Sequence, residues 1–419
     1  MQISGLTGNE IYCLALKGLL PGEIVVGNSV RSMGVLGSLF SFGREVVGGE
    51  IARSTSLISE GRHAAIERME AEAQKAGATG VAGVVSELRT LSGFTEFLAQ
   101  GTSLYLDRSR ITANVPFFSC AASGTELFSH LDCGYAPRKF VMGNVVYSLG
   151  IARGFVGNLR TFARGEVVEF SQMYDEVRHL ALKRLIEEAS RCGANAVVDI
   201  HVQTIPLGGG ILEVLMTGTA SYHPQLPAGQ VATSELTGEE LWSLAAMGYR
   251  PLQLVTATSV YSLGVVAGLS SLIKAIGRGE LTELTQIIYE ARENCISKLR
   301  EEATRVGAER VIGNRLTIRE LSPGLIEVIG LGTAVVRAPQ GLRPESQMLP
   351  PQAVLREGEQ PAPELHSVGS LPERLSNLES KLRPVEQVQS IVGSLSSCLG
   401  IGCMLAFVFG VIALIAFGR

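Results

Sequence analysis

Three copies of one pattern, about 115 residues apart, constrain the fold of this chain more than any other feature. A short phrase recurs as NSVRSMG, NVVYSLG and SVYSLG, and it ends at the turn glycines Gly34, Gly150 and Gly264. Gly-Glu, Gly-Ala and Gly-Thr pairs then follow in the same order in every copy. Several markers in register predict three tandem structural repeats.

Each copy opens with the start and stop signals of a short helix. The three openings are LTGNEIYCLALKGLLPGEIVVG at 6–27, SGTELFSHLDCGYAPRKFVMG at 123–143 and LTGEELWSLAAMGYRPLQLVTA at 236–257. A Thr or Ser cap precedes an acidic first turn and an apolar stripe, and a Gly and a Pro end the pattern. We therefore expect a short helix that leads into a strand.

A longer helix and two strands complete each copy. In FSQMYDEVRHLALKRLIEEASRCGA the apolar residues recur every three or four positions, which predicts one buried helix face, and Gly193 ends the helix, as Gly77 and Gly307 do in the other copies. The stretches AVVDIHVQTI and ILEVLMTGTASY then alternate like strands. The fold class is α+β, with three α-β-α-β-β units at 1–110, 120–225 and 234–337, each a helix on a small antiparallel sheet.

The order of these motifs resembles the YbjQ-like family, whose domain is often labelled as heavy-metal-binding. The resemblance covers residues 24–106, 140–223 and 254–337, and copy one departs from it at VRSMG and VGGE. It implies a dodecin-like sheet and homo-oligomeric rings, commonly of five subunits. The biochemical role of the family is not established.

The long helix carries the candidate metal ligands. Glu60 and His63 in copy one, and Glu176 and His179 in copy two, are three residues apart and so share a helix face. A solvated Glu/Arg face, or a salt-bridged contact between neighbouring units, explains the same pattern, because a Glu-x-Arg sequence recurs in all three copies. A divalent metal is therefore a weaker interpretation than an ion pair.

A second candidate lies on the strand of copy two. Alternation places Asp199 and His201 on one face of that strand, but copies one and three have Gly and Val, or Gly and Arg, at these positions. The seven cysteines are scattered without a CxxC motif, so we expect reduced thiols and no zinc site. A site formed by Asp199 and His201 would therefore be specific to copy two.

Other functional classes lack a signal. Lys and Arg number 36 against 40 Asp and Glu, so we expect no nucleic-acid partner. The chain contains no GxSxG, Walker or dinucleotide motif, and no nucleophile with a base, so we expect no enzyme, and the motifs identify no cofactor beyond the divalent metal considered above. The dodecin-like resemblance alone implies that a flavin remains an alternative ligand.

The C-terminal part differs in composition from the repeats. Residues 338–369 form a Pro-rich flexible linker, and 370–392 an amphipathic juxtamembrane segment. Residues 394–418 are uncharged and long enough for a transmembrane helix, and this anchor includes Leu399, Phe407, Val411 and Phe417. The first residues lack a basic start and an apolar run, so we expect no signal peptide and a cytoplasmic body on a single-pass anchor.

Together these features predict a membrane-anchored, homo-oligomeric interaction or scaffold protein with an unknown protein partner. Five chains that stack three rings, one per repeat, would direct all anchors the same way, as cyclic symmetry permits. A ring closed within one chain or a pair of chains is the rival stoichiometry. The alternative function is a metal- or small-ligand-binding protein that uses the Glu-x-Arg-His helix faces.

Overall fold

The computed structural model of this protein describes ten segments of the chain: 3–32, 49–91, 94–113, 115–148, 164–208, 210–227, 229–263, 282–322, 324–338 and 342–348. The turn glycines Gly34, Gly150 and Gly264 lie outside these residues, as do the expected juxtamembrane segment and membrane anchor. None of the described helices is long and apolar enough to cross a membrane. Residues 1–353 form one compact unit.

The expected short helix opens every repeat. The three helices are α1 (Gly8–Leu16), α4 (Gly124–Asp132) and α7 (Gly238–Ala246), and each has a complete capping box. In α1, for example, the Thr7 side chain accepts from the Glu10 backbone while the Glu10 carboxylate accepts from the Thr7 backbone. Each helix is followed by a glycine with φ between +71° and +84°, a conformation that other residues adopt at a cost.

The long helices also lie where the sequence predicts them. They are α3 (Ala52–Lys75), α6 (Val168–Arg191) and α9 (Thr282–Arg305), and the glycines after them, Gly77, Gly193 and Gly307, have φ of +78°, +71° and +73°. In α6 the predicted apolar face is buried at Tyr174, Val177, Ala181, Leu185 and Ala189, and Phe170 packs beside it. This confirms the helical periodicity.

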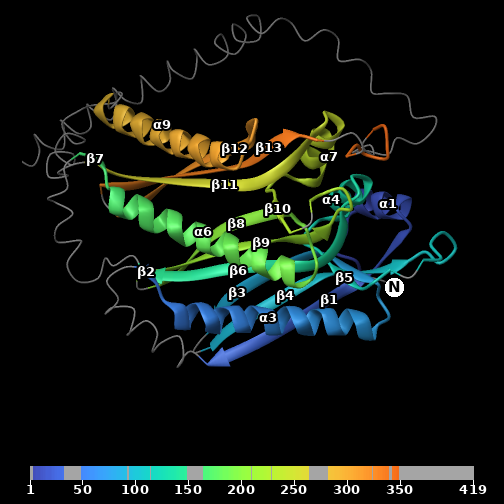
Figure 1. Ribbon diagram of the computed structural model, residues 1–419. Helices are drawn as coiled ribbons and strands as arrows, with labels where there is room; N and C mark the ends of the chain where they lie inside the picture. Colours follow the sequence, from blue (N-terminus) through green and yellow to red (C-terminus); the bar gives the residue numbers. More distant parts are fainter. Residues whose placement is uncertain are drawn as a thin grey trace, which may run out of the picture. The chain divides into compact units, whose positions relative to one another are not determined.

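Three antiparallel strands form the sheet of each repeat (Figure 1). The first repeat has β1 (Leu19–Ser32), β3 (Gly80–Leu91) and β4 (Phe94–Leu106); the second has β6 (Ala136–Ser148), β8 (Ala196–Gly208) and β9 (Ile211–Tyr222); the third has β11 (Tyr249–Ser262), β12 (Arg310–Ser322) and β13 (Leu325–Arg337). In each the last strand lies in the middle, so the order is β1-β4-β3 and its equivalents. The fold is α+β, as predicted.

Two-residue strands join neighbouring repeats, which the sequence did not predict. The strands β2 (Gly49–Glu50) and β7 (Gly165–Glu166) pair antiparallel with β6 and β11 of the following repeat. In the other direction, β5 (Phe118–Ser119) and β10 (Ala232–Thr233) pair in parallel with β3 and β8 of the preceding repeat. The repeats therefore exchange strands instead of forming separate units with purely antiparallel sheets.

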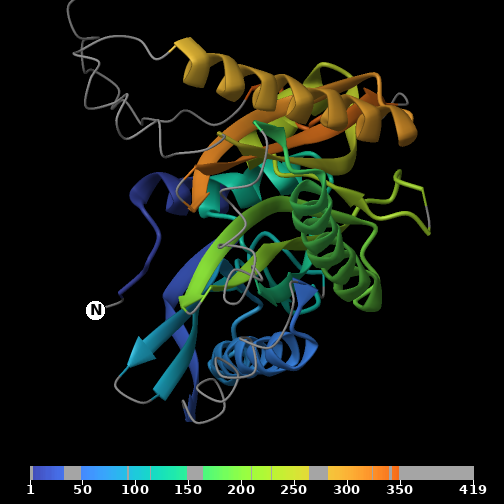
Figure 2. The same ribbon diagram turned by 90° about the vertical axis from the view of Figure 1, so that its left-hand side faces the viewer.

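The long helices also pack on two repeats at once. One core cluster joins α3 to Phe140, Met142 and Val146 on β6, and another joins α6 to Leu254 and Val260 on β11. Figure 2 shows α3, α6 and α9 at successive levels of the stack, in blue, green and orange. Each of the first two helices is thus a shared layer between its own sheet and the next.

The start of the expected flexible linker is held in place. Ser346 donates to Asp132 through its backbone N–H and its hydroxyl, at 3.0 and 2.7 Å. Asp132 also accepts from Lys17 at 2.7 Å and from the Trp242 indole at 2.8 Å. One buried carboxylate therefore ties all three short helices to the segment 342–348, where Leu342 is also buried.

Candidate functional site

A buried arginine connects each of the first two long helices, α3 and α6, to the next repeat. Arg62 on α3 is fully buried, and its Nη2 and Nε donate to the two carboxylate oxygens of Glu213 on β9, at 2.8 and 3.2 Å. Arg62 Nη1 also donates to the backbone and hydroxyl oxygens of Ser86, and Asn144 donates to Glu213. A paired, bidentate geometry is what makes such a buried charge tolerable.

The same contact recurs one repeat later. Arg178 on α6 donates to Glu327 on β13 at 2.8 Å, and both side chains are buried. Its Nη1 donates to the Thr258 hydroxyl at 2.6 Å, and Arg319 donates to the second oxygen of Glu327. The Glu-x-Arg sequence therefore places its arginine in an ion pair between repeats.

Each histidine of the helix pairs with a glutamate of the following repeat. His63 Nε2 lies 3.1 Å from Glu188 on α6, and its Nδ1 lies 2.8 Å from the Ser59 carbonyl oxygen. Only a protonated ring donates from both nitrogens, and the hydrogen bond to Glu188 is the main reason that the pKa of His63 is raised. His63 is thus held by the next repeat, and the contact favours the protonated form of its ring.

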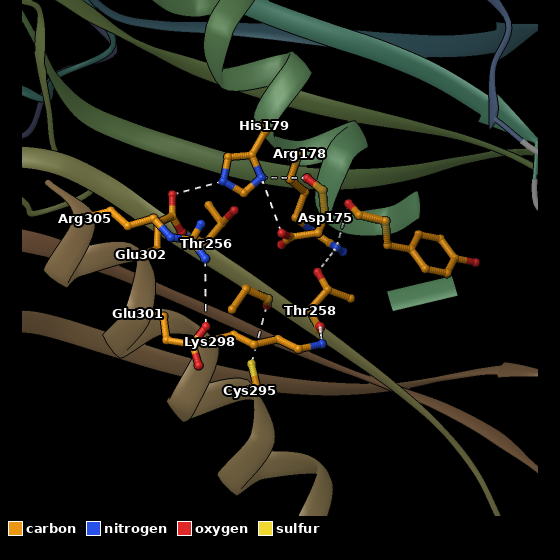
Figure 3. A network of polar contacts seen from close by, with 12 residues as sticks. Asp175, Arg178, His179, Thr256, Thr258, Cys295, Lys298, Glu301, Glu302 and Arg305 are labelled. Carbon is orange, nitrogen blue, oxygen red and sulfur yellow. Dashed lines mark hydrogen bonds and ion pairs between the residues drawn. The ribbon is translucent and has the colours of Figure 1, made fainter. Parts of the chain in front are cut away.

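His179 repeats this arrangement and appears in Figure 3. Its Nε2 lies 3.0 Å from Glu302 on α9 and its Nδ1 lies 2.8 Å from the Asp175 carbonyl oxygen. The bond to Glu302 raises the pKa of His179 to about 9. Glu302 also accepts from the backbone N–H of Thr256, at 2.9 Å, just as Glu188 does from β6.

The other two residues of the proposed metal sites do not share these bonds. Glu60 contacts Ser56 and Arg31, at 3.0 and 3.4 Å, and Glu176 is exposed. Within the described segments, no group of three or more His, Cys, Asp or Glu side chains is placed to hold a metal ion. The two-ligand metal hypothesis remains a prediction, and the acids nearest to the histidines are Glu188 and Glu302.

The exchanged two-residue strands add a third ion pair to each junction. Glu50 on β2 lies 2.8 Å from Arg184, and Glu166 on β7 lies 2.6 Å from Lys298. A hydroxyl of the long helix also forms a hydrogen bond to the sheet of the next repeat, since the Thr55 hydroxyl accepts from the Val146 N–H at 2.9 Å. The repeated Gly-Glu marker therefore belongs to the contact between repeats.

A small cavity lies at each junction beside the histidine. The first has a volume of about 430 Å³ and is lined by His63, Asn144, Arg184 and Arg191. The second has about 240 Å³ and is lined by the equivalent residues His179, Thr258, Lys298 and Arg305 (Figure 3). Both contain acids and bases, so each junction is a paired charge network of the same design.

The second predicted site, on β8, is altered by a bulge. The register shifts between Val198 and His201, and Asp199 has φ of +56°. Asp199 is buried with one carboxylate oxygen unpartnered, and His201 is exposed. The structure still brings the predicted pair together, because His201 Nδ1 lies 3.6 Å from the other carboxylate oxygen of Asp199 and 3.1 Å from its carbonyl oxygen. Burial raises the pKa of Asp199 to about 8, and the charges of Glu126 and Glu239 add to the effect.

The equivalents of Asp199 explain the bulge. Gly83 and Gly313 occupy the same bulge with φ of +63° and +65°. A glycine at two of three equivalent positions was a signal for a left-handed residue, and it could have warned against simple alternation. The five described cysteines, Cys13, Cys120, Cys133, Cys192 and Cys295, are free thiols.

Comparison with known proteins places the three repeats among relatives. A family model with the description "Putative heavy-metal-binding" matches residues 21–107, 136–223 and 246–338. The encapsulin nanocompartment protein Rv1762c of Mycobacterium tuberculosis is 33% identical over 231 residues, which are 52% of this chain and 84% of that protein. A UPF0145 protein of Pyrococcus furiosus is 44% identical over 78 residues, 19% of this chain and 68% of that protein. Another of Thermosipho melanesiensis is 35% identical over 80 residues, 19% and 74% respectively.

Proposed function

The chain belongs to the YbjQ family, which it represents in three tandem copies, and on that premise we propose that it is a homo-oligomeric scaffold protein. Its repeats use their long helices and sheets to bind one another. Among the described residues, the same surfaces are left uncovered on the sheet of the first repeat and on α9 of the third. Assembly of several chains through these surfaces is the function that the described residues support best.

The carrying observation is an open apolar face on the first repeat. Ile24, Val26, Val30 and Phe94 on β1 and β4 are 44–55% exposed. Their equivalents are at most 3% exposed, because α3 and α6 cover them: Phe140, Met142, Val146 and Ile211 in the second repeat, and Leu254, Thr256, Val260 and Leu325 in the third. Asn28, Glu96 and Gln100 lie between these apolar side chains on the same face. Exposed apolar side chains gathered on one sheet face mark an interaction surface.

The energy available from this face favours association. Full burial of one large apolar side chain contributes about 1.5–3 kcal/mol, and these four are already about half buried, so their cover contributes roughly 3–6 kcal/mol before the loss of freedom on binding is counted. Ion pairs at the rim of such an interface determine its register and specificity more than its affinity. A second copy of the chain satisfies both, because it presents the complementary surface.

The relatives and the C-terminal sequence support the same proposal. One relative is named an encapsulin nanocompartment protein, a name that describes an assembly. We expect the apolar segment 394–418 to anchor the assembly in a membrane with the repeats on the cytoplasmic side. Deletion of 394–418 should move the protein from the carbonate-washed membrane pellet to the supernatant, and unchanged pelleting would contradict the anchor.

The test of self-association is native mass spectrometry of the full-length chain in a mild detergent. We expect masses that are integral multiples of one chain, and a shift to the monomer for Val26→Glu, which places a charge on the open face. Val168→Glu is the matched control, because Val168 is an equally exposed valine on α6 outside this face. A monomer for the unaltered chain at all concentrations would contradict the scaffold.

A metal- or small-ligand-binding function is the second candidate. The family description and the cavities beside His63 and His179 favour it. Elemental analysis of protein purified without chelator should then find a stoichiometric metal that falls when both histidines are replaced by alanine. Metal-free protein that still binds no added zinc or nickel would exclude this alternative.

A further inference from the structure

The last long helix, α9, presents the counterpart of the open sheet face. On α3 and α6 the residues that pack on the next repeat are buried: Thr55, Ile58, Arg62 and Ile66, and equivalently Ser171, Tyr174, Arg178 and Leu182. On α9 the same positions hold Thr285, Ile288, Arg292 and Ile296, and all four are exposed or only partly buried. None of the described segments covers them as the second and third repeats cover α3 and α6.

The charges at the two ends complement each other. Arg292 is the equivalent of Arg62 and Arg178, and it is exposed. Glu96 on β4 is the equivalent of Glu213 and Glu327, and it is partly exposed with a long 3.4 Å bond from Asn28. Each end therefore keeps one half of the ion pair that both junctions within the chain complete.

We propose that α9 of one chain docks on β1 and β4 of a second copy, with Arg292 paired to Glu96, so that the stack of repeats continues from chain to chain. This rests on the proposed self-association and adds its polarity and its contacts. The two surfaces differ, so the interface is head-to-tail. Such an interface gives a closed ring, or a filament if the rotation does not close.

One position makes the junction between chains different from those within a chain. Glu72 on α3 accepts from the Val26 N–H at 2.7 Å, in the pose of Glu188 and Glu302. The residue that faces it from the preceding repeat is a histidine at both internal junctions, but the equivalent on α9 is Glu293. The docked helix thus places two carboxylates together where a histidine–carboxylate pair stands elsewhere.

This acid pair weakens the contact between chains relative to the internal junctions. Like charges side by side oppose association, although Arg68 and Lys75 on α3 and Arg292 on α9 would lie nearby and reduce the repulsion. The same type of junction therefore occurs with two strengths. The stronger junction joins repeats within the chain, and the weaker junction joins one chain to the next.

A charge exchange tests the pairing on the full-length chain. Arg292→Glu alone and Glu96→Arg alone should each raise the dissociation constant of the assembly by about 30-fold or more, because one charge faces its own sign. The double variant should recover most of the affinity. Glu290→Arg is the control, since it also changes the charge by two on α9, but its equivalent Glu176 stays exposed at the internal junction.

The outcomes separate this interface from self-association in general. An unaltered chain that assembles while both single variants assemble equally well would overturn the docking mode and leave the scaffold intact. Loss in the single variants without recovery in the double variant would overturn the pairing. An unaltered chain that never assembles would overturn both proposals.

A second variant tests the position of Glu293. Glu293→His restores the residue type of the internal junctions and should lower the dissociation constant by about tenfold, measured by analytical ultracentrifugation. The variant sits on an exposed helix position, so folding is not at risk. Unchanged or weaker association would place Glu293 away from Glu72 and contradict the register.

Discussion

The strands β1 and β6 are equivalent in their repeats, yet they are buried differently. In β1 the buried and exposed residues alternate from Val25 to Val30, whereas every residue of β6 from Phe140 to Ser148 is buried. Both strands have apolar side chains on both faces. The difference is the long helix of the preceding repeat, α3, which covers β6, whereas no described long helix covers β1 in this way.

This comparison shows that a strand with apolar residues on both faces is expected to pack against a layer of protein on each face. A strand that packs on one layer has a polar outer face, and one that is buried on both faces has a continuous apolar run. The stretch EIVVGNSV in β1 has apolar residues on its open face. The first repeat therefore has the composition of an internal repeat and the exposure of a terminal one.

The largest expected contrast concerns the junction arginines. Arg62→Ala leaves Glu213 as a buried carboxylate without its charged partner, and this should lower the free energy of unfolding by about 3–5 kcal/mol. The equivalent Arg292→Ala should leave it unchanged at concentrations where the chain is monomeric, because Arg292 is exposed. Urea unfolding followed by circular dichroism measures both, and equal losses would contradict the comparison.

A smaller contrast concerns the sheet faces themselves. Leu254→Ala opens a cavity under α6 and should cost about 2–5 kcal/mol. Ile24→Ala removes the equivalent side chain from the open face and should cost well under 1 kcal/mol in the monomer, while it weakens assembly. A large loss of monomer stability from Ile24→Ala would mean that this face is already covered within the chain.

At the bulge, a substitution that makes the second repeat like the other two should stabilise the protein. Asp199→Gly gives the second repeat the residue of the other two, removes a strained left-handed aspartate, and should stabilise the protein by about 1–2 kcal/mol. The folded pKa of Asp199 is about 8 against an ordinary 3.8, so wild-type stability should fall as the pH rises between these values.

Thermal unfolding of the wild type and of Asp199→Gly, at about pH 5 and about pH 8, compares their stabilities near the two ends of this pH range. The variant should gain more over wild type at the higher pH. An equal gain at both values would show that only backbone strain, and not the buried charge, is relieved.

The smallest effect is expected at His179. Its folded pKa is about 9 against an ordinary 6.5, so its stabilising contribution is complete below the lower value and is lost as the pH rises through the higher one. The side chain is 41% exposed, so solvent screening keeps the effect small. Carbon-13 or proton NMR titration of the ring should find the raised pKa, and Glu302→Gln should lower it.

Much of the fold could be predicted from sequence because its signals are local. Capping residues such as Thr7 and Glu10, and stop glycines such as Gly193, act within a few residues of one another. The pairing of Arg62 with Glu213 is different, because these residues are 151 positions apart in different repeats. Repetition identified the arginine, but neither its partner Glu213 nor the order in which one copy binds the next.

The candidate sites depend on contacts of the same long range. Helical spacing places His63 on one face with Glu60, whereas its nearest acid is Glu188 of the following repeat, as the alternative of a salt-bridged contact between neighbouring units expects. Asp199 and His201 lie together as predicted, but through a bulge that regular alternation does not predict. Contacts between copies and departures from regular strands were the parts that the sequence alone left open.

The central claim is that a second copy covers the open face of the first repeat. The most direct measurement is the rate of thiol labelling of Val30→Cys in the full-length chain, above and below the concentration at which it assembles, against the unaltered chain as background. The account predicts that labelling is slow in the assembly, and fast on dilution or in the added presence of Arg292→Glu. Fast labelling at every concentration would show that this face stays open, and would contradict the account.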